Sequence, residues 1–248
     1  ILYTTKSGKK GGGKSEISFN TGITFEDAYI MPKLQNQYGG GSSTTFENQI
    51  INGKTYKIAD YATDESWGPK YDPTLMYLPW NAFDPEFSND YLKEKAWVAS
   101  PNDVDSFFRT GITRSNSLSF TKSNQDSGMR FSYANQKTEG IVPNSSLTKN
   151  TFSINANSKL SEKLKVEGMA TYVQTRGFNR PEVGYGDNGL AQKFFQWGQR
   201  QLDFSELKNY KLADGSQRSW NRIAWDDATP NYSDNPYWII NENTSSDT

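Results

Sequence analysis

Four residues near the start of the chain satisfy the phosphate-loop pattern G-x-x-x-x-G-K-[ST]: Gly8, Gly13, Lys14 and Ser15. Such a loop binds phosphate because its backbone N–H groups point at the anion and a helix begins directly behind it. The apolar residues that follow instead alternate with polar ones: Ile17, Phe19, Ile23 and Phe25. This period of two is typical of a strand. We therefore expect a basic, glycine-rich linker that leads into a strand, and no nucleotide site.

The composition restricts the remaining chemistry. The 248 residues include no cysteine and no histidine, which excludes disulfides, thiolate zinc sites, serine–histidine triads and cysteine nucleophiles within them. The net charge of −1 does not favour a nucleic-acid partner. Two acidic pairs remain, Asp103 with Asp105 and Asp226 with Asp227. Glycosidase carboxylates face each other across a bond at about 5–9.5 Å, which residues so close in one chain rarely do. We expect no enzyme, no cofactor and no metal site.

Five segments alternate apolar and polar side chains, as strands with one apolar face do: residues 17–25, 117–121, 129–134, 152–157 and 164–172. Their connections alternate in length. A long segment at about 32–113 is followed by the short NQDSG, the longer TEGIVPNSSLT, the short LSEKL and the long segment 177–248. Alternate connections of an antiparallel meander lie at opposite ends of the sheet, so the long ones share one end. Outer-membrane barrels have this asymmetry.

Four stretches resemble the SusC/RagA-type TonB-dependent outer-membrane transporters, in that family's order: ESWGPK at 65–70, PNDVDSFFRTG at 101–111, FSYANQKTEGIVPNSSL at 131–147 and DNPYW at 234–238. The opening ILYTTKSGKKG resembles the end of their plug domain. The resemblance implies an all-β fold, an antiparallel transmembrane β-barrel segment of about five strands from a plugged barrel of ~22 strands. Residues 1–14 would end the plug and its linker. Residues 15–248 would form the N-terminal part of the barrel, with long extracellular loops at about 32–113 and 177–248.

The resemblance also implies a function. SusC-like transporters import glycans, peptides or similar nutrients across the outer membrane of Gram-negative bacteria, energised through TonB and without a cofactor. Their partners are a SusD-like surface lipoprotein, TonB, membrane lipid and the nutrient. The TonB box, most of the plug and most of the barrel have no counterpart in this sequence. We therefore expect the chain to be a piece of a longer polypeptide, or to be completed by other chains.

The alternation predicts which side chains face lipid: Ile17, Phe19, Ile23, Phe25, Leu118, Phe120, Met129, Phe131, Phe152, Ile154, Val166 and Ala170. Two alternatives remain open at this point. A soluble or surface glycan-binding β-module would pack these faces against each other and purify without detergent. A carbohydrate-active enzyme would use one of the acidic pairs.

All seven tryptophans lie outside the five segments. Exposed rings stack on sugars or anchor partners, whereas long loops also need large side chains as small cores of their own. We expect both long segments to be ordered and to pack on each other, on the SusD-like surface lipoprotein, which acts as a lid in that family, or on both. Four rings are expected to be buried there and are also the candidate ligand or partner contacts: Trp67, Trp80, Trp220 and Trp225.

Overall fold

The computed structural model describes residue 13 and residues 15–248, which belong to two compact units. The sheet unit contains the described residues up to 27, residues 110–180 and residues 245–248, and the loop unit contains residues 28–109 and 181–244. The predicted linker at 1–14 lies outside the described residues, except for Gly13. Among the described residues, no helix has the length and apolar composition needed to cross a membrane.

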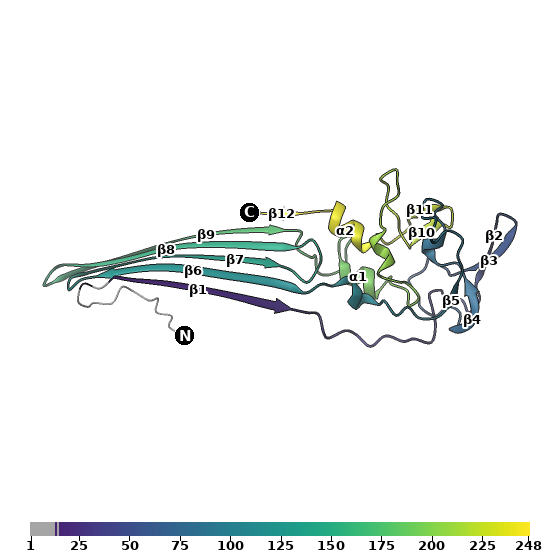
Figure 1. The fold of residues 1–248 in the computed structure, drawn as a ribbon, viewed down its shortest axis with the longest axis horizontal. Coiled ribbons are helices and arrows are strands. Elements are labelled where there is room, and N and C mark those ends of the chain that lie inside the picture. The colour runs from purple at the N-terminus through teal and green to yellow at the C-terminus, as the bar shows by residue number, and fades with distance from the viewer. Residues whose placement is uncertain (1–12, 14) are drawn as a thin grey trace. The chain divides into compact units, whose positions relative to one another are not determined.

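The sheet unit is a six-stranded antiparallel sheet in the order β1-β6-β7-β8-β9-β12 (Figure 1). Its strands are β1 (Ser15–Glu26), β6 (Gly111–Ser123), β7 (Ser127–Glu139), β8 (Ser146–Ser161), β9 (Leu164–Phe178) and the short β12 (Ser246–Asp247). The five predicted strands are confirmed, and each is longer than its alternating segment. Because Ser15 begins a strand, the helix that a phosphate loop requires is not there.

The connections have the predicted asymmetry. Asn124 closes the turn between β6 and β7, where its side-chain oxygen accepts hydrogen bonds from the backbone N–H groups of Asp126 and Ser127 at 2.9 and 2.6 Å. Residues 162–163 join β8 to β9. The longer connections, at 27–110, 140–145 and 179–245, all leave from the opposite end of the sheet. We call the two ends the turn end and the loop end.

The strand register lines up similar side chains in rows across the sheet. One row consists of Ile17, Phe120, Phe131, Ile154 and Ala170. The next row toward the loop end consists of Phe19, Leu118, Tyr133, Phe152 and Tyr172. Side chains of successive residues point to opposite faces of a sheet, so these rows share one face, which we call the apolar face.

The opposite face, which we call the polar face, carries small hydroxyl side chains between those two apolar rows: Ser18, Ser119, Ser132, Ser153 and Thr171. A hollow of about 440 Å³ lies in the sheet unit, and most of its lining residues, among them Ser117, Gln136 and Thr151, belong to this face. The sheet is therefore hollowed on its polar side.

The apolar face has no covering layer among the described residues. Ile17, Phe19 and Phe131 are 73%, 64% and 41% exposed, and Ala170 is exposed as well. Phe120 is half-buried between its neighbours. The alternative of a glycan-binding module predicts that these apolar faces pack against each other in two layers, and the described residues of the sheet unit provide no second sheet.

The loop unit has short elements only. It contains the hairpins β2–β3 (Glu47–Ile51, Lys54–Ile58), β4–β5 (Asp72–Tyr77, Lys95–Trp97) and β10–β11 (Arg222–Ala224, Asp227–Pro230). It also contains the 3-10 helices η1 (Trp80–Ala82), η2 (Val104–Phe107) and η3 (Glu206–Lys208), and the α-helices α1 (Leu190–Phe195) and α2 (Pro236–Glu242). The sequence patterns did not indicate any of these elements.

An aromatic cluster forms one core of the loop unit. Trp97 is fully buried, and its ring centroid lies 4.7 Å from that of Tyr77 and 4.8 Å from that of Phe46. The indole Nε1 donates a hydrogen bond to the Pro69 carbonyl at 3.0 Å. Burial of such large rings contributes most of the apolar stabilisation in a unit that has few aliphatic side chains.

Buried amide side chains hold the two halves of the loop unit together. Asn221 accepts hydrogen bonds from the backbone N–H groups of Tyr232 and Ser233, and it donates to the Tyr61 carbonyl at 2.6 Å. Gln199 donates to the carbonyls of Asp60 and Thr63. Irregular backbone needs such partners because buried N–H and C=O groups must be paired. The expectation that the two long segments are ordered and pack on each other is confirmed.

The backbones of the YGGG segment and the ESWGPK segment approach each other closely at four glycines. The Gly68 N–H donates to the Gly39 carbonyl at 3.0 Å, and the Trp67 N–H donates to the Gly41 carbonyl at 3.0 Å. A Cβ atom on Gly68 would lie 2.1 Å from the carbonyl oxygen of Gly40. Neither backbone can move without breaking these bonds, so this position requires glycine.

We expect Gly68→Ala to destabilise the loop unit by about 1–3 kcal/mol, the usual cost of overpacking. The readout is faster amide hydrogen exchange at residues 39–41 in the full protein. Gly186→Ala is the matched control, because no atom lies within 4 Å of the position that its new methyl group would take. Equal exchange rates in the two variants would contradict the close approach.

Candidate ligand-binding site in the loop unit

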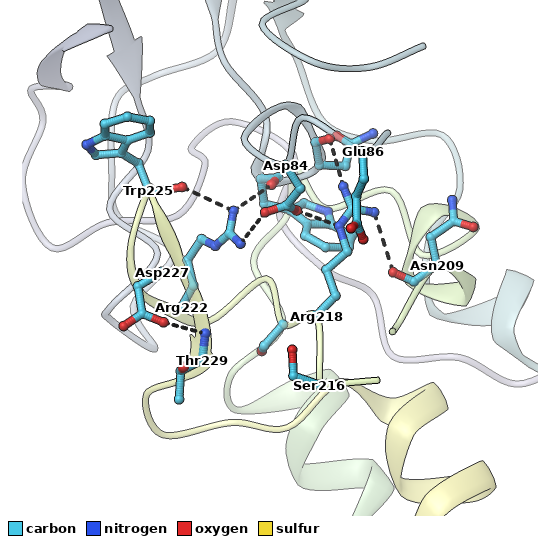
Figure 2. Close-up of polar contacts among 12 residues, drawn as sticks. Asp84, Glu86, Asn209, Ser216, Arg218, Arg222, Trp225, Asp227 and Thr229 are labelled. Carbon is cyan, nitrogen blue, oxygen red and sulfur yellow. Dashed lines mark hydrogen bonds and ion pairs between the residues drawn. The ribbon is translucent and has the colours of Figure 1, made fainter. Parts of the chain in front are cut away.

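A buried carboxylate between two guanidinium groups organises the centre of the loop unit (Figure 2). Arg218 Nε lies 2.5 Å from Asp84 Oδ2, and Arg222 Nη2 lies 2.8 Å from Asp84 Oδ1. Asp84 follows η1 in the segment 28–109, whereas Arg222 begins β10 in the segment 181–244. Both segments of the loop unit therefore contribute to this cluster of three charged side chains. Both arginines are almost completely buried.

Arg218 has further partners that hold it in place. Its Nη2 donates to the Asn81 carbonyl at 2.9 Å, and its guanidinium carbon lies 3.6 Å from the Phe87 ring centroid. Burial lowers the pKa of Arg218, while the hydrogen bond and the charge of Asp84 raise it. One carboxylate thus compensates two buried cations, which leaves the group with an excess positive charge.

Arg222 is the less saturated of the two arginines. Its Nη1 makes only long contacts, 3.5 Å to the Trp80 carbonyl and 3.4 Å to the Trp225 carbonyl, the latter visible in Figure 2. Its Nε has no hydrogen-bond partner among the described residues. A buried donor without a partner costs about 1–3 kcal/mol, so the position of Arg222 favours an acceptor from a ligand or water.

Arg222 lines a cavity of about 210 Å³. Its walls also include the carboxylates of Glu47 and Asp60 and the rings of Phe83 and Trp225. The cavity lies between the β2–β3 hairpin and the β10–β11 hairpin, because each contributes residues to it. It therefore combines hydrogen-bond acceptors, a buried cation and aromatic surface, which suits a small polar ligand with hydroxyl or carbonyl groups.

The surroundings of Glu47 in the cavity disfavour its charged form. Partial burial raises the pKa of Glu47 above its ordinary value of 4.5, and the charge of Asp60 raises it further. The folded protein therefore holds the Glu47 proton more tightly than the unfolded chain does. Stability falls as the pH rises from the unfolded pKa through the higher folded pKa, so the ionised Glu47 destabilises the folded protein above that range.

We expect Glu47→Gln to stabilise the loop unit at pH 7 and to change its stability little at pH 4, because the substitution removes only the charged form. Hydrogen exchange of the β2 and β3 amides at both pH values is the measurement. Glu65→Gln, at another exposed glutamate that does not line the cavity, is the control. A Glu47→Gln variant that is less stable than the wild type at pH 7 would show that the carboxylate has a partner that stabilises its charge.

A second cavity, of about 180 Å³, is lined by Trp80, Asn81, Lys95 and Asp203 among others. Trp80 Nε1 and Asn81 Nδ2 have no hydrogen-bond partner among the described residues, although both residues are buried. This cavity also offers donors, but it lacks the pair of carboxylates that the first one has.

The four tryptophans singled out from the sequence divide into three classes. Trp80 and Trp220 are buried, 2% and 1% exposed, as predicted. Trp67 is 64% exposed, and its ring centroid lies 5.6 Å from that of Tyr38, so the loop unit itself does not bury it; its burial against the surface lipoprotein stays a prediction. Trp225 is half-buried at the cavity wall, so its predicted burial is only partly met. The fully buried Trp97 was not singled out.

One member of each acidic pair of the enzyme alternative has a structural partner. Asp103 caps η2 by accepting from the Val104 N–H at 2.7 Å and pairs with Arg200 at 2.9 Å. Asp227 accepts from the Thr229 N–H at 3.0 Å (Figure 2), and its neighbour Asp226 is exposed. Residues that sequence reasoning missed, Glu47, Asp60 and Arg222, line the cavity instead.

Comparison with known proteins does not extend these observations to a family. No family model matches the chain, and no curated protein matches it.

Proposed function

We propose that the chain is part of a SusC-like TonB-dependent transporter that imports glycans, peptides or similar nutrients across the outer membrane of a Gram-negative bacterium. One observation carries the proposal: in the part of the chain that the structure describes, a single-layered antiparallel sheet has an uncovered apolar face, a hollowed polar face and all its longer connections at one end. Transmembrane β-barrels combine these features.

The two faces of the sheet fit different surroundings. Large side chains such as Ile17, Phe19 and Phe131 are exposed on the apolar face, and water disfavours so large an apolar surface. Lipid solvates it at no such cost. The hydroxyl rows of the polar face suit a water-filled lumen.

The two edges of the sheet need neighbours under this proposal. Among the described residues β1 pairs only with β6, and β9 pairs with β12 only at Gly177 and Phe178. Unpaired strand edges do not persist in hydrocarbon, because their N–H and C=O groups would have no partners. The remaining strands of the transporter would supply the pairing and close the barrel.

The loop unit would then be extracellular. Its cavity with Glu47, Arg222 and Trp225 would contact the nutrient, and the exposed Trp67 would contact the SusD-like lid lipoprotein. TonB would act through the plug. No catalytic residue is required for this function.

Fractionation of the full-length protein tests the proposal against its main alternative, a soluble or surface glycan-binding module. A transporter is expected in the outer-membrane fraction, requires detergent for extraction, and loses uptake when the proton gradient is dissipated. The module is favoured only by the aromatic cavity, and it would be recovered without detergent. Recovery of a monodisperse full-length protein in buffer alone would refute the transporter.

Trp67→Ala tests the assignment of the lid contact. An exposed indole that anchors a partner contributes about 2 kcal/mol or more to binding. We expect the substitution to reduce co-purification of the lipoprotein at least tenfold while the protein still inserts. Tyr185→Ala, at another highly exposed ring in the loop unit, is the control. Unchanged co-purification in the Trp67 variant would remove Trp67 from the interface.

A further inference from the structure

The side chains on the apolar face become more polar from one row to the next toward the loop end. Beyond the row that contains Tyr133 and Tyr172 lies a row of amides and one hydroxyl, which we call the amide row: Thr21, Asn116, Asn135, Asn150 and Gln174. The next row, which we call the basic row, consists of Ile23, Arg114, Lys137, Thr148 and Arg176. Both rows lie on the apolar face because their residues are two and four positions from the tyrosine row.

The basic row has more positive charge than its neighbours compensate. Arg114 and Lys137 are directly opposite each other, an arrangement that disfavours strand pairing for like charges. Both pair with one carboxylate, that of Glu139, at 3.2 and 3.6 Å. Arg176 is exposed and has no ion-pair partner among the described residues. Three cations therefore share one anion, and the row attracts further negative charge.

The amide row lies between the tyrosine row and the basic row. Tyr133 donates its hydroxyl hydrogen to Asn150 Oδ1 at 2.9 Å, and Asn135 Nδ2 donates to the same oxygen at 2.8 Å. Rows are about 7 Å apart along the strands, so the basic row lies about 20 Å from the row of Phe131. Apolar, aromatic, amide and cationic groups thus follow in the order in which a bilayer passes from hydrocarbon to headgroup.

The turn end of the same face differs. Its only cation in a described row is Lys122, opposite Met129. Lys159 and Lys165 have the register of the polar face, and each is paired, with Glu162 and Glu167 respectively. The excess of positive charge on the apolar face is therefore larger at the loop end, where three cations share one carboxylate, than at the turn end, which has a single lysine.

We propose that the basic row binds the anionic, phosphate-bearing headgroups of membrane lipids in the leaflet on the loop side. Arg114, Lys137 and Arg176 contact the headgroups, and the amide row lies at the level of the polar groups that link headgroup to acyl chains. The inference rests on the proposed function, since it requires the apolar face to be in lipid.

The experiment uses the full-length protein in phosphatidylcholine nanodiscs with a trace of spin-labelled phosphatidic acid or spin-labelled phosphatidylcholine. The wild type is expected to prefer the anionic label about fivefold or more. In the variant Arg114→Gln/Lys137→Gln/Arg176→Gln the preference is expected to fall to about one. Raising the salt to about 0.5 M should reduce the wild-type preference in the same direction, because salt screens exposed charges.

Lys149→Gln is the matched control. Lys149 lies on β8 between Thr148 of the basic row and Asn150 of the amide row, so it has a similar position along the strand. Its side chain, however, has the register of the polar face. The proposal predicts an unchanged preference in this variant. An equal loss in the Lys149 variant, or a wild type with bound lipid but no preference for the anionic label, overturns the inference. A protein that immobilises neither label is not embedded in lipid, and that outcome overturns the proposed function itself.

Discussion

Replacing Asp84 by Asn is expected to destabilise the loop unit by about 3–5 kcal/mol. The substitution keeps the shape of the side chain but leaves two buried guanidinium groups, those of Arg218 and Arg222, without a carboxylate. Removing one partner of a buried ion pair has a cost of this size because the charge of the other partner is left uncompensated. The two contacts join residues 134 and 138 positions apart, so both halves of the unit should loosen together.

Limited proteolysis of the full protein within residues 28–109 and 181–244 measures the effect. Combined replacement of all three residues, Asp84→Leu with Arg218→Met and Arg222→Met, is expected to recover part of the loss because no buried charge remains. Glu94→Gln is the control, since its ion pair with Lys54 is solvent-exposed and contributes little to stability. An Asp84→Asn variant as resistant as the wild type would contradict the structural role of the network.

The double substitution Phe131→Arg/Ile154→Arg is expected to abolish insertion of the full-length protein into the outer membrane. Phe131 and Ile154 are direct partners on β7 and β8, in the apolar row between the row of Met129 and the row of Tyr133. An arginine on the lipid face near the bilayer midplane costs about 2–4 kcal/mol, so two together cost about 4–8 kcal/mol. Flotation of membranes in a density gradient measures the inserted fraction.

Ser132→Arg/Ser153→Arg is the matched control for that pair. Ser132 and Ser153 are partners one position along the same two strands, and they lie on the polar face. Their replacement is expected to leave insertion intact, because a lumen accommodates charge. Similar insertion of both double variants would show that the two faces of the sheet do not differ in their surroundings.

The sequence was sufficient to predict the long strands and the sides on which their connections lie. Alternation identified residues 17–25 and 129–134 because one face there is apolar and the other is not. It missed the loop-side ends of the strands, since Asn116, Asn135 and Asn150 are polar on the apolar face and remove the alternation. Backbone pairing with the neighbouring strand continues through these positions without any help from apolar side chains.

The loop unit was predictable only in outline. Aromatic content and length indicated ordered segments, but no local pattern distinguishes the exposed Trp67 from the buried Trp97. Burial there depends on distant partners, such as the glycine at 39 whose missing Cβ leaves room for the Trp97 ring. The cavity residues were missed for the same reason, because Glu47 and Arg222 come together only through tertiary folding.

Spin labels placed one at a time along β7, from residue 129 to 137, test most directly whether the apolar face lies in lipid. Their relaxation by oxygen, which concentrates in hydrocarbon, is compared with relaxation by a water-soluble nickel complex in the full-length protein in bilayers. The proposal predicts a period of two, with oxygen access greatest at 129, 131 and 133, nickel access greatest at 130, 132 and 134, and a rise of nickel access at 135 and 137. Equal access of nickel to odd and even positions, or exclusion of both reagents from 129, 131 and 133, would contradict it.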